Sequence, residues 1–229
     1  MLTIGGRRIT LEDYQHVLHE NTKIDIHAEA IERITKSYEF LEAFHQNKII
    51  YGINTGLGPM AQYKIEDADR LKLHYNAIRS HASGCGDPVQ PVYVRSAMIT
   101  LLSNFCQGHS GIHPEVIELI RQFINLEIIP VVPEHGSVGA SGDLVQLAHI
   151  ALALIGEGEV FYQGKLVPAS EALSKNNLKP ISIHVREGLS LINGTSFMTG
   201  TGMVNLLHAR NLINWAIAVA EMLNEIVRS

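Results

Sequence analysis

Cysteine, aromatic residues and charged residues are all sparse in this chain. It has two cysteines, 6% aromatic residues and 18% charged residues, whereas hydrophobic residues make up 46% of its 229 positions. Cys85 and Cys106 are too few for a disulfide framework or a structural zinc site. The high hydrophobic and low charged fractions exclude a disordered segment and indicate a globular protein with a sizeable core.

Long hydrophobic runs and clusters of basic residues are also lacking. The apolar stretches at 144–155 and 215–223 are interrupted or too short to span a bilayer, and residues 1–6 are too short and polar for a signal peptide. The net charge of -5 is modest and the basic residues are scattered, which argues against nucleic acid or a membrane as partner. We therefore expect a soluble protein in a reducing, cytoplasmic setting.

Helical periodicity dominates the pattern that is present. It predicts helices over residues 11–19, 28–44, 68–79, 92–106, 114–125 and 143–155. Two short hairpins are predicted as well. One pairs 2–4 with 7–10 around two glycines, and the other pairs 160–162 with 165–167. The predicted fold class is mainly α with small β-hairpins.

The last predicted helix has no stop signal. After Asn193 and Gly194 the helical pattern continues to the C-terminus without a capping glycine or proline, and the chain ends in mid-pattern. We therefore expect the chain to be truncated.

A glycine-rich loop precedes the helix predicted at 143–155. Its glycines, Gly136, Gly139 and Gly142, lack the spacing of a dinucleotide fingerprint, and no Lys-Ser or Lys-Thr follows them as in a P-loop. Gly142 directly follows Ser141, which excludes the G-x-S-x-G nucleophile elbow. One interpretation is a structural loop in which Asp143 caps the following helix.

The order Ala140-Ser141-Gly142 permits a second, chemical interpretation. Attack of the Gly142 nitrogen on the Ala140 carbonyl closes a five-membered ring, and loss of two waters, one carrying the Ser141 hydroxyl, leaves an exocyclic methylene. Small residues suit so compressed a turn, and glycine removes Cβ crowding at the attacking nitrogen. The product, 4-methylidene-imidazol-5-one (MIO), is an electrophile that no ordinary side chain supplies.

The motifs around this tripeptide resemble those of the histidine, phenylalanine and tyrosine ammonia-lyases. The resemblance covers essentially the whole chain, and within the family the stretches 58–63 and 143–147 most resemble bacterial tyrosine ammonia-lyases. The segments that carry it are 51–58, 79–84, 108–111, 136–146, 156–158 and 191–195.

The resemblance assigns a role to each of several residues. Tyr51 matches the catalytic tyrosine that takes the substrate β-proton as phenolate, so its site must activate it; the alternative is a tyrosine that packs a loop. Asn193 matches the asparagine that holds the MIO oxygen and the substrate, and the alternative is a turn residue. Asp143 is expected to cap its helix and to support MIO formation.

Substrate choice is assigned to His81, with Leu57 and Gly58 lining the pocket. A histidine side chain hydrogen-bonds an imidazole or a phenol but offers nothing to a plain phenyl ring. L-Phenylalanine is therefore the least expected substrate. L-Tyrosine and L-histidine stay open, with a preference for tyrosine and its product p-coumarate.

The resemblance also implies an organisation. Residues 1–192 correspond to an MIO-bearing N-terminal domain and residues 193–229 to the start of a central helical bundle that builds a homotetramer. Later helices would supply further site residues, so we expect this polypeptide alone to be inactive or nearly so. Two alternatives remain, an MIO-dependent aminomutase and a catalytically incomplete fragment that acts only in assembly. A metal pair of His109 and His113 is not expected, because Gly111 interrupts any helix between them.

Overall fold

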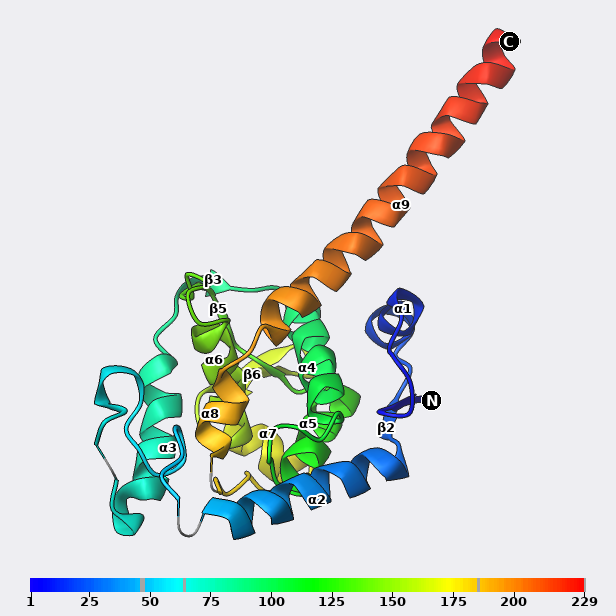
Figure 1. Cartoon of the computed structure of the whole chain (residues 1–229). Helices are drawn as coiled ribbons and strands as arrows, with labels where there is room; N and C mark the ends of the chain where they lie inside the picture. The colour runs from blue at the N-terminus through cyan, green and yellow to red at the C-terminus, as the bar shows by residue number, and fades with distance from the viewer. Residues whose placement is uncertain (46–47, 64, 185, 229) are drawn as a thin grey trace.

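A computed structural model describes residues 1–45, 48–63, 65–184 and 186–228, and this part of the chain is mainly helical, as predicted (Figure 1). The helices are α1 (Leu11–His19), α2 (Ala28–Phe44), the 3-10 turn η2 (Gly58–Met60), α3 (Asp67–His81), α4 (Pro91–Phe105), α5 (Pro114–Leu126), α6 (Leu144–Leu154), α7 (Ala169–Lys175), α8 (Glu187–Ile192) and α9 (Ser196–Val227). The strands are β1 (Leu2–Ile4), β2 (Ile24–Ile26), β3 (Cys85–Pro88), β4 (Ile129–Pro130), β5 (Pro133–His135), β6 (Glu159–Tyr162) and β7 (Lys165–Pro168).

Helix α4 lies at the centre of the core and packs along the first part of α9. It begins with a proline at its first turn, where the missing N–H costs no hydrogen bond, and most of its side chains are buried. The two helix backbones approach closely at Gly200, which is buried, and the buried Ser96 hydroxyl donates to the Gly200 carbonyl at 2.7 Å. A glycine is needed there because a Cβ would lie 2.5 Å from Ala97 Cα.

We expect Gly200→Ala to lower the free energy of unfolding by about 1–3 kcal/mol, since the added methyl overpacks the α4–α9 contact. Gly202→Ala is the matched control: a Cβ at Gly202 meets nothing within 4 Å, so the gain in helix propensity leaves stability unchanged or higher by up to about 1 kcal/mol. Urea unfolding followed by circular dichroism measures both variants. Equal stabilities of the two variants would contradict the proposed close approach.

The N-terminal hairpin prediction was wrong. β1 pairs in parallel with β2, with Leu2 opposite Ile24 and Ile4 opposite Ile26. The residues that follow the two glycines serve α1 instead: Thr10 is its N-cap and forms a capping box with Asp13. This capping removes residues 7–10 from any strand.

The second hairpin prediction is confirmed. β6 and β7 pair antiparallel around Gln163 and Gly164, and β4 adds to the other edge of β6. The sheet holds the end of α5 and the chain that leads to β5. It thereby places the glycine-rich loop that follows β5 in front of α6.

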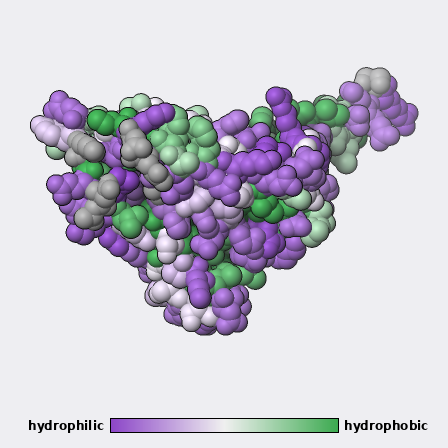
Figure 2. Space-filling view, turned by 60° about the horizontal axis from the view of Figure 1, so that its bottom comes forward, coloured by the Kyte–Doolittle hydropathy of each residue, from purple (hydrophilic) through white to green (hydrophobic). Residues whose placement is uncertain are grey.

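The second part of α9 projects away from the body of the molecule (Figure 1). Beyond Leu207 its large apolar side chains are exposed; they are Leu212, Ile213, Trp215, Ile217, Val219, Met222, Leu223, Ile226 and Val227. The face seen from the α2 side is mostly hydrophilic, with hydrophobic residues in separate patches (Figure 2). Among the described residues, no helix combines the length and the hydropathy needed to cross a membrane.

Candidate active site

The loop 139–143 folds back on itself just before α6. Two isolated β-bridges join Gly142 to Gly139 and to Ala140, and Gly142 has a φ of +78°. A Cβ on Gly142 would lie 2.3 Å from the carbonyl oxygen of Gly194, which also accepts a hydrogen bond from the Asp143 amide at 2.8 Å. Only glycine fits this position, because both its φ and its neighbour exclude a side chain.

These features fit a tripeptide that closes into an MIO ring. The chain reverses at Ala140-Ser141-Gly142, and the attacking residue is the one whose Cβ has no room. Ala140 and Ser141 are exposed, so their side chains meet no close packing that would oppose the change. The residues present therefore match the requirements of the ring.

The prediction that Asp143 caps α6 with its side chain was wrong. Asp143 occupies the N-cap position but makes no side-chain hydrogen bond to its own helix. Its carboxylate instead accepts from the Met198 amide at 2.8 Å, in the first turn of α9. The α6 amide at Val145 donates to the Ser137 hydroxyl at 3.0 Å, so Ser137 does the capping. Sequence reasoning missed Ser137 because a serine eight residues upstream matches no capping pattern.

Asn193 lies beside the tripeptide, at the C-cap of α8. It is exposed, and the next residue, Gly194, makes the contacts with Gly142 and Asp143. The structure thus places the predicted asparagine one residue from the contact between Gly194 and the tripeptide.

Tyr51 opens the loop that packs against α8. Its ring is 52% exposed, and its hydroxyl oxygen accepts a hydrogen bond from the Gly58 amide at 3.2 Å. The loop can lie close to α8 because Gly52, at φ +74°, has no side chain. A Cβ at this position would collide with the Leu189 side chain. Leu57 is half-buried and packs on the core, whereas Gly58 is exposed.

His81 is the last residue of α3 and is half-buried. Its Nδ1 lies 2.7 Å from the Ala77 carbonyl oxygen. A carbonyl can only accept, so Nδ1 carries the hydrogen and Nε2 keeps its lone pair in the neutral ring. In that neutral form, Nε2 of His81 can act as a hydrogen-bond acceptor.

The end of α3 is tied to the glycine-rich loop through β3. Cys85 pairs with His135 in β5, just before the loop, and the Gly84 amide donates to His149 Nε2 of α6 at 3.2 Å. Burial lowers the pKa of His149, which favours the neutral ring that this bond requires. Within the described part of the chain, no hydrogen bond joins Tyr51 or His81 directly to the tripeptide.

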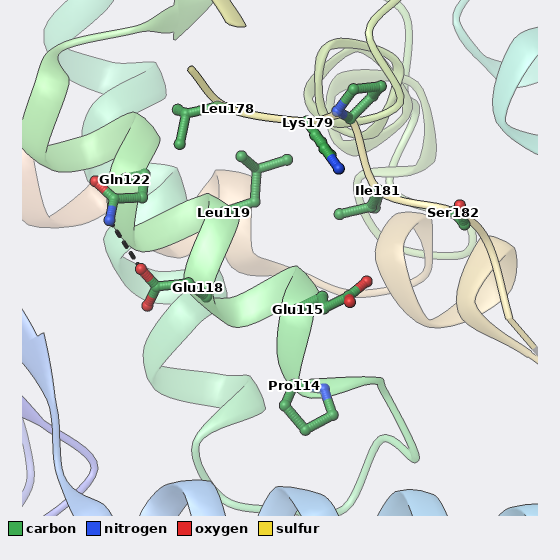
Figure 3. Close-up of a pocket in the computed structure, with 10 residues that line it drawn as sticks. Pro114, Glu115, Glu118, Leu119, Gln122, Leu178, Lys179, Ile181 and Ser182 are labelled. Atoms are coloured by element: carbon green, nitrogen blue, oxygen red, sulfur yellow. Dashed lines mark hydrogen bonds between the residues drawn. The ribbon is translucent and has the colours of Figure 1, made fainter. Parts of the chain in front are cut away.

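A large groove lies elsewhere, between α5 and the segment 178–182 (Figure 3). It encloses about 620 Å³, and none of the predicted site residues lines it. Because it lacks both Tyr51 and the predicted MIO-forming tripeptide, we place the candidate site at the loop 139–143 instead.

Comparisons with known proteins identify relatives along the whole chain. The aromatic amino acid lyase family model matches residues 9–229. A histidine ammonia-lyase of Geobacillus sp. strain WCH70 is 44% identical over 230 residues, which cover 100% of this chain and 45% of that protein. The chain thus spans about half the length of the curated relatives it matches.

Solved structures resemble the fold closely. The Pantoea agglomerans phenylalanine aminomutase superposes with a TM-score of 0.90 at 31% identity, covering 96% of this chain and 42% of the other. Histidine ammonia-lyase from Trypanosoma cruzi gives 0.84 at 31% identity, covering 92% and 42%.

The predicted resemblance to tyrosine ammonia-lyases in particular is not supported, because the curated relatives are named histidine ammonia-lyases. Local motifs at residues 58–63 and 143–147 suggested the tyrosine branch, yet identity over the full chain outweighs two short segments. From the match over residues 9–229, the chain belongs to the aromatic amino acid lyase family.

Proposed function

We propose that this chain is the electrophile-bearing part of a histidine ammonia-lyase, which eliminates ammonia from L-histidine to give urocanate. The observation that carries the proposal is the Ala140-Ser141-Gly142 turn, in which Gly142 is pressed against the Gly194 carbonyl and tolerates no Cβ. The names of the curated relatives support histidine as the substrate.

Ala140, Ser141 and Gly142 would hold the MIO group. When formed, that group supplies an electrophile that makes the amino group of the substrate a better leaving group. Asn193 lies at the adjoining turn and can hydrogen-bond a carbonyl oxygen there with its amide. The Asp143 carboxylate accepts from the Met198 amide. This hydrogen bond fixes the start of α6 to the first turn of α9.

Tyr51 is the proposed base for the β-proton. The residue is 52% exposed, and the Gly58 amide donates to its hydroxyl oxygen at 3.2 Å. An N–H donor binds a phenolate more strongly than a neutral phenol, because the acceptor then carries charge. The Gly58 amide thus supplies a donor at the oxygen that would take the proton.

His81 is the proposed selectivity residue. Its Nε2 lone pair can accept from an imidazole N–H or from a phenol O–H, so it selects against phenylalanine. L-Tyrosine remains the alternative substrate.

The test is an assay of a full-length protein on L-histidine, L-tyrosine and L-phenylalanine. We expect urocanate as the main product, and His81→Phe to lower kcat/KM for histidine by about 10²-fold, since the polar pairing is lost. His19→Phe, the same change at an exposed histidine of α1, is the control and should keep the histidine activity. Coumarate formed faster than urocanate would exclude histidine in favour of tyrosine.

An aminomutase is the second candidate, because one of the most similar solved structures is named a phenylalanine aminomutase. An aminomutase returns the ammonia to the β-carbon and yields a β-amino acid. Chromatography of the same reaction mixture separates the two: free ammonia with an unsaturated acid supports the lyase, and a β-amino acid supports the mutase.

Assembly is proposed to run through α9. Its exposed apolar side chains beyond Leu207 need a partner surface, as large apolar patches on soluble proteins mark interfaces. We propose that they enter the helical bundle of a homotetramer, with residues 1–192 as the MIO-bearing domain. A chain without the rest of that bundle is then expected to show little or no turnover.

A further inference from the structure

Three metal-ligating side chains meet at the N-terminus of α5, away from the loop 139–143. His113 is the N-cap of α5, Glu115 lies in its first turn, and His184 comes from the segment before α8. One ligand atom from each lies within 4.8 Å of the others. The sequence offered only His109 as a partner for His113, whereas the fold supplies His184 from a distant segment.

A buried carboxylate holds the two histidines in place. Glu187 is 0% exposed and accepts from the His113 amide at 2.6 Å and from the His184 amide at 2.6 Å. Both backbones are thereby fixed to one side chain, and the imidazole rings lie with their centroids 4.7 Å apart. Preorganisation of this kind lowers the entropic cost of binding an ion between them.

An aromatic ring and an exposed carboxylate lie beside the two imidazoles. Tyr38 packs edge-on against both rings, with centroid distances of 4.9 Å to His113 and 5.9 Å to His184. Glu115 is exposed and adds a negative charge beside the pair.

We propose that His113, Glu115 and His184 form a binding site for a divalent transition-metal ion of the zinc class. Two imidazoles and one carboxylate are a common zinc ligand set, which leaves a fourth position for water. The set also suits Co²⁺ and Ni²⁺, because imidazole binds all three. None of these residues belongs to the candidate active site, so the proposal does not rest on the proposed function.

The proposed site is open to solvent at Glu115, which is exposed. Glu115 lines the groove between α5 and 178–182, and in Figure 3 its carboxylate points from α5 toward the segment with Ile181 and Ser182. The present partner of His113 Nδ1 is the Glu115 amide at 3.3 Å, a long hydrogen bond that an ion can replace at small cost. A bound ion would join α5 to the segment that leads into α8.

The experiment titrates the metal-free 229-residue chain with Co²⁺ and follows the visible absorption, and then displaces Co²⁺ with Zn²⁺. We expect one Co²⁺ per chain. Glu115→Gln and His184→Ala should weaken binding by at least about tenfold, because even outer-shell changes cost that much at metal sites. His109→Ala, at an exposed histidine in the same loop, is the matched control and should bind as the parent does.

Circular dichroism without metal checks that each variant is folded. Glu115 is on the surface, so Glu115→Gln retains the fold even if a histidine variant does not. A melting temperature that rises with Zn²⁺ in the parent and in His109→Ala, but not in Glu115→Gln, supports the site. Absence of binding at millimolar Co²⁺, or binding unchanged in Glu115→Gln and His184→Ala, overturns it.

Discussion

Ser141→Ala in a full-length protein is expected to lower the rate of ammonia elimination by at least about 10³-fold, because the variant cannot form the electrophile. The Ser141 hydroxyl is the group that leaves as the second water, and alanine has no such leaving group. Ser141 is exposed and makes no side-chain hydrogen bond in the described part of the chain, so the fold should remain unchanged.

Intact mass and steady-state assays on L-histidine measure this prediction. The parent should be lighter than its sequence mass by two waters, and the variant should not. Ser174→Ala, at an exposed serine of α7, is the control for a serine-to-alanine change and should keep both the mass loss and the rate. A variant that deaminates histidine as fast as the parent would exclude the proposed chemistry.

Gly142→Ala is expected to lower the free energy of unfolding by about 3 kcal/mol or more, from a positive φ and a collision together. The added Cβ would lie 2.3 Å from the Gly194 oxygen, which is a backbone atom and cannot rotate away. The same crowding should also prevent ring closure, so the mass loss of two waters should disappear.

Gly139→Ala is the matched control for this change. Gly139 has a φ of +75°, close to the +78° of Gly142, but a Cβ there meets nothing within 4 Å. We expect it to cost only about 1 kcal/mol, the conformational part alone. Urea unfolding of both variants isolates the contact with Gly194, and equal losses would mean that this contact does not restrict position 142.

Local patterns predicted most helices of the described residues, but they missed the short helices α7 and α8. The apolar periodicity of 114–125 and a proline at the first turn correspond to α5, Pro114–Leu126. The hairpin of β6 and β7 was equally visible, because its two strands flank a Gln-Gly turn. In both cases the interactions that form the element lie within a few residues, so a short window contains the needed information.

Long-range pairings could not be predicted in the same way. The N-terminal strand pairs with β2, beyond α1, and not with the residues just after the glycines. Asp143 has the residue type and position of a helix cap, yet its carboxylate binds the start of α9. The residue type shows that the Asp143 carboxylate can accept hydrogen bonds from nearby amides. The tertiary fold determines which amide lies close enough to donate.

By itself, the sequence determined the candidate tripeptide, since the order Ala140-Ser141-Gly142 places the hydroxyl and the unhindered nitrogen that the proposed ring needs within three neighbouring residues. It also determined most helices, whose hydrogen bonds are local. The tertiary structure alone decided that Gly194 closes over Gly142 and that His184 meets His113. Those contacts join segments far apart in the chain, and no local pattern encodes them because they depend on how whole helices pack.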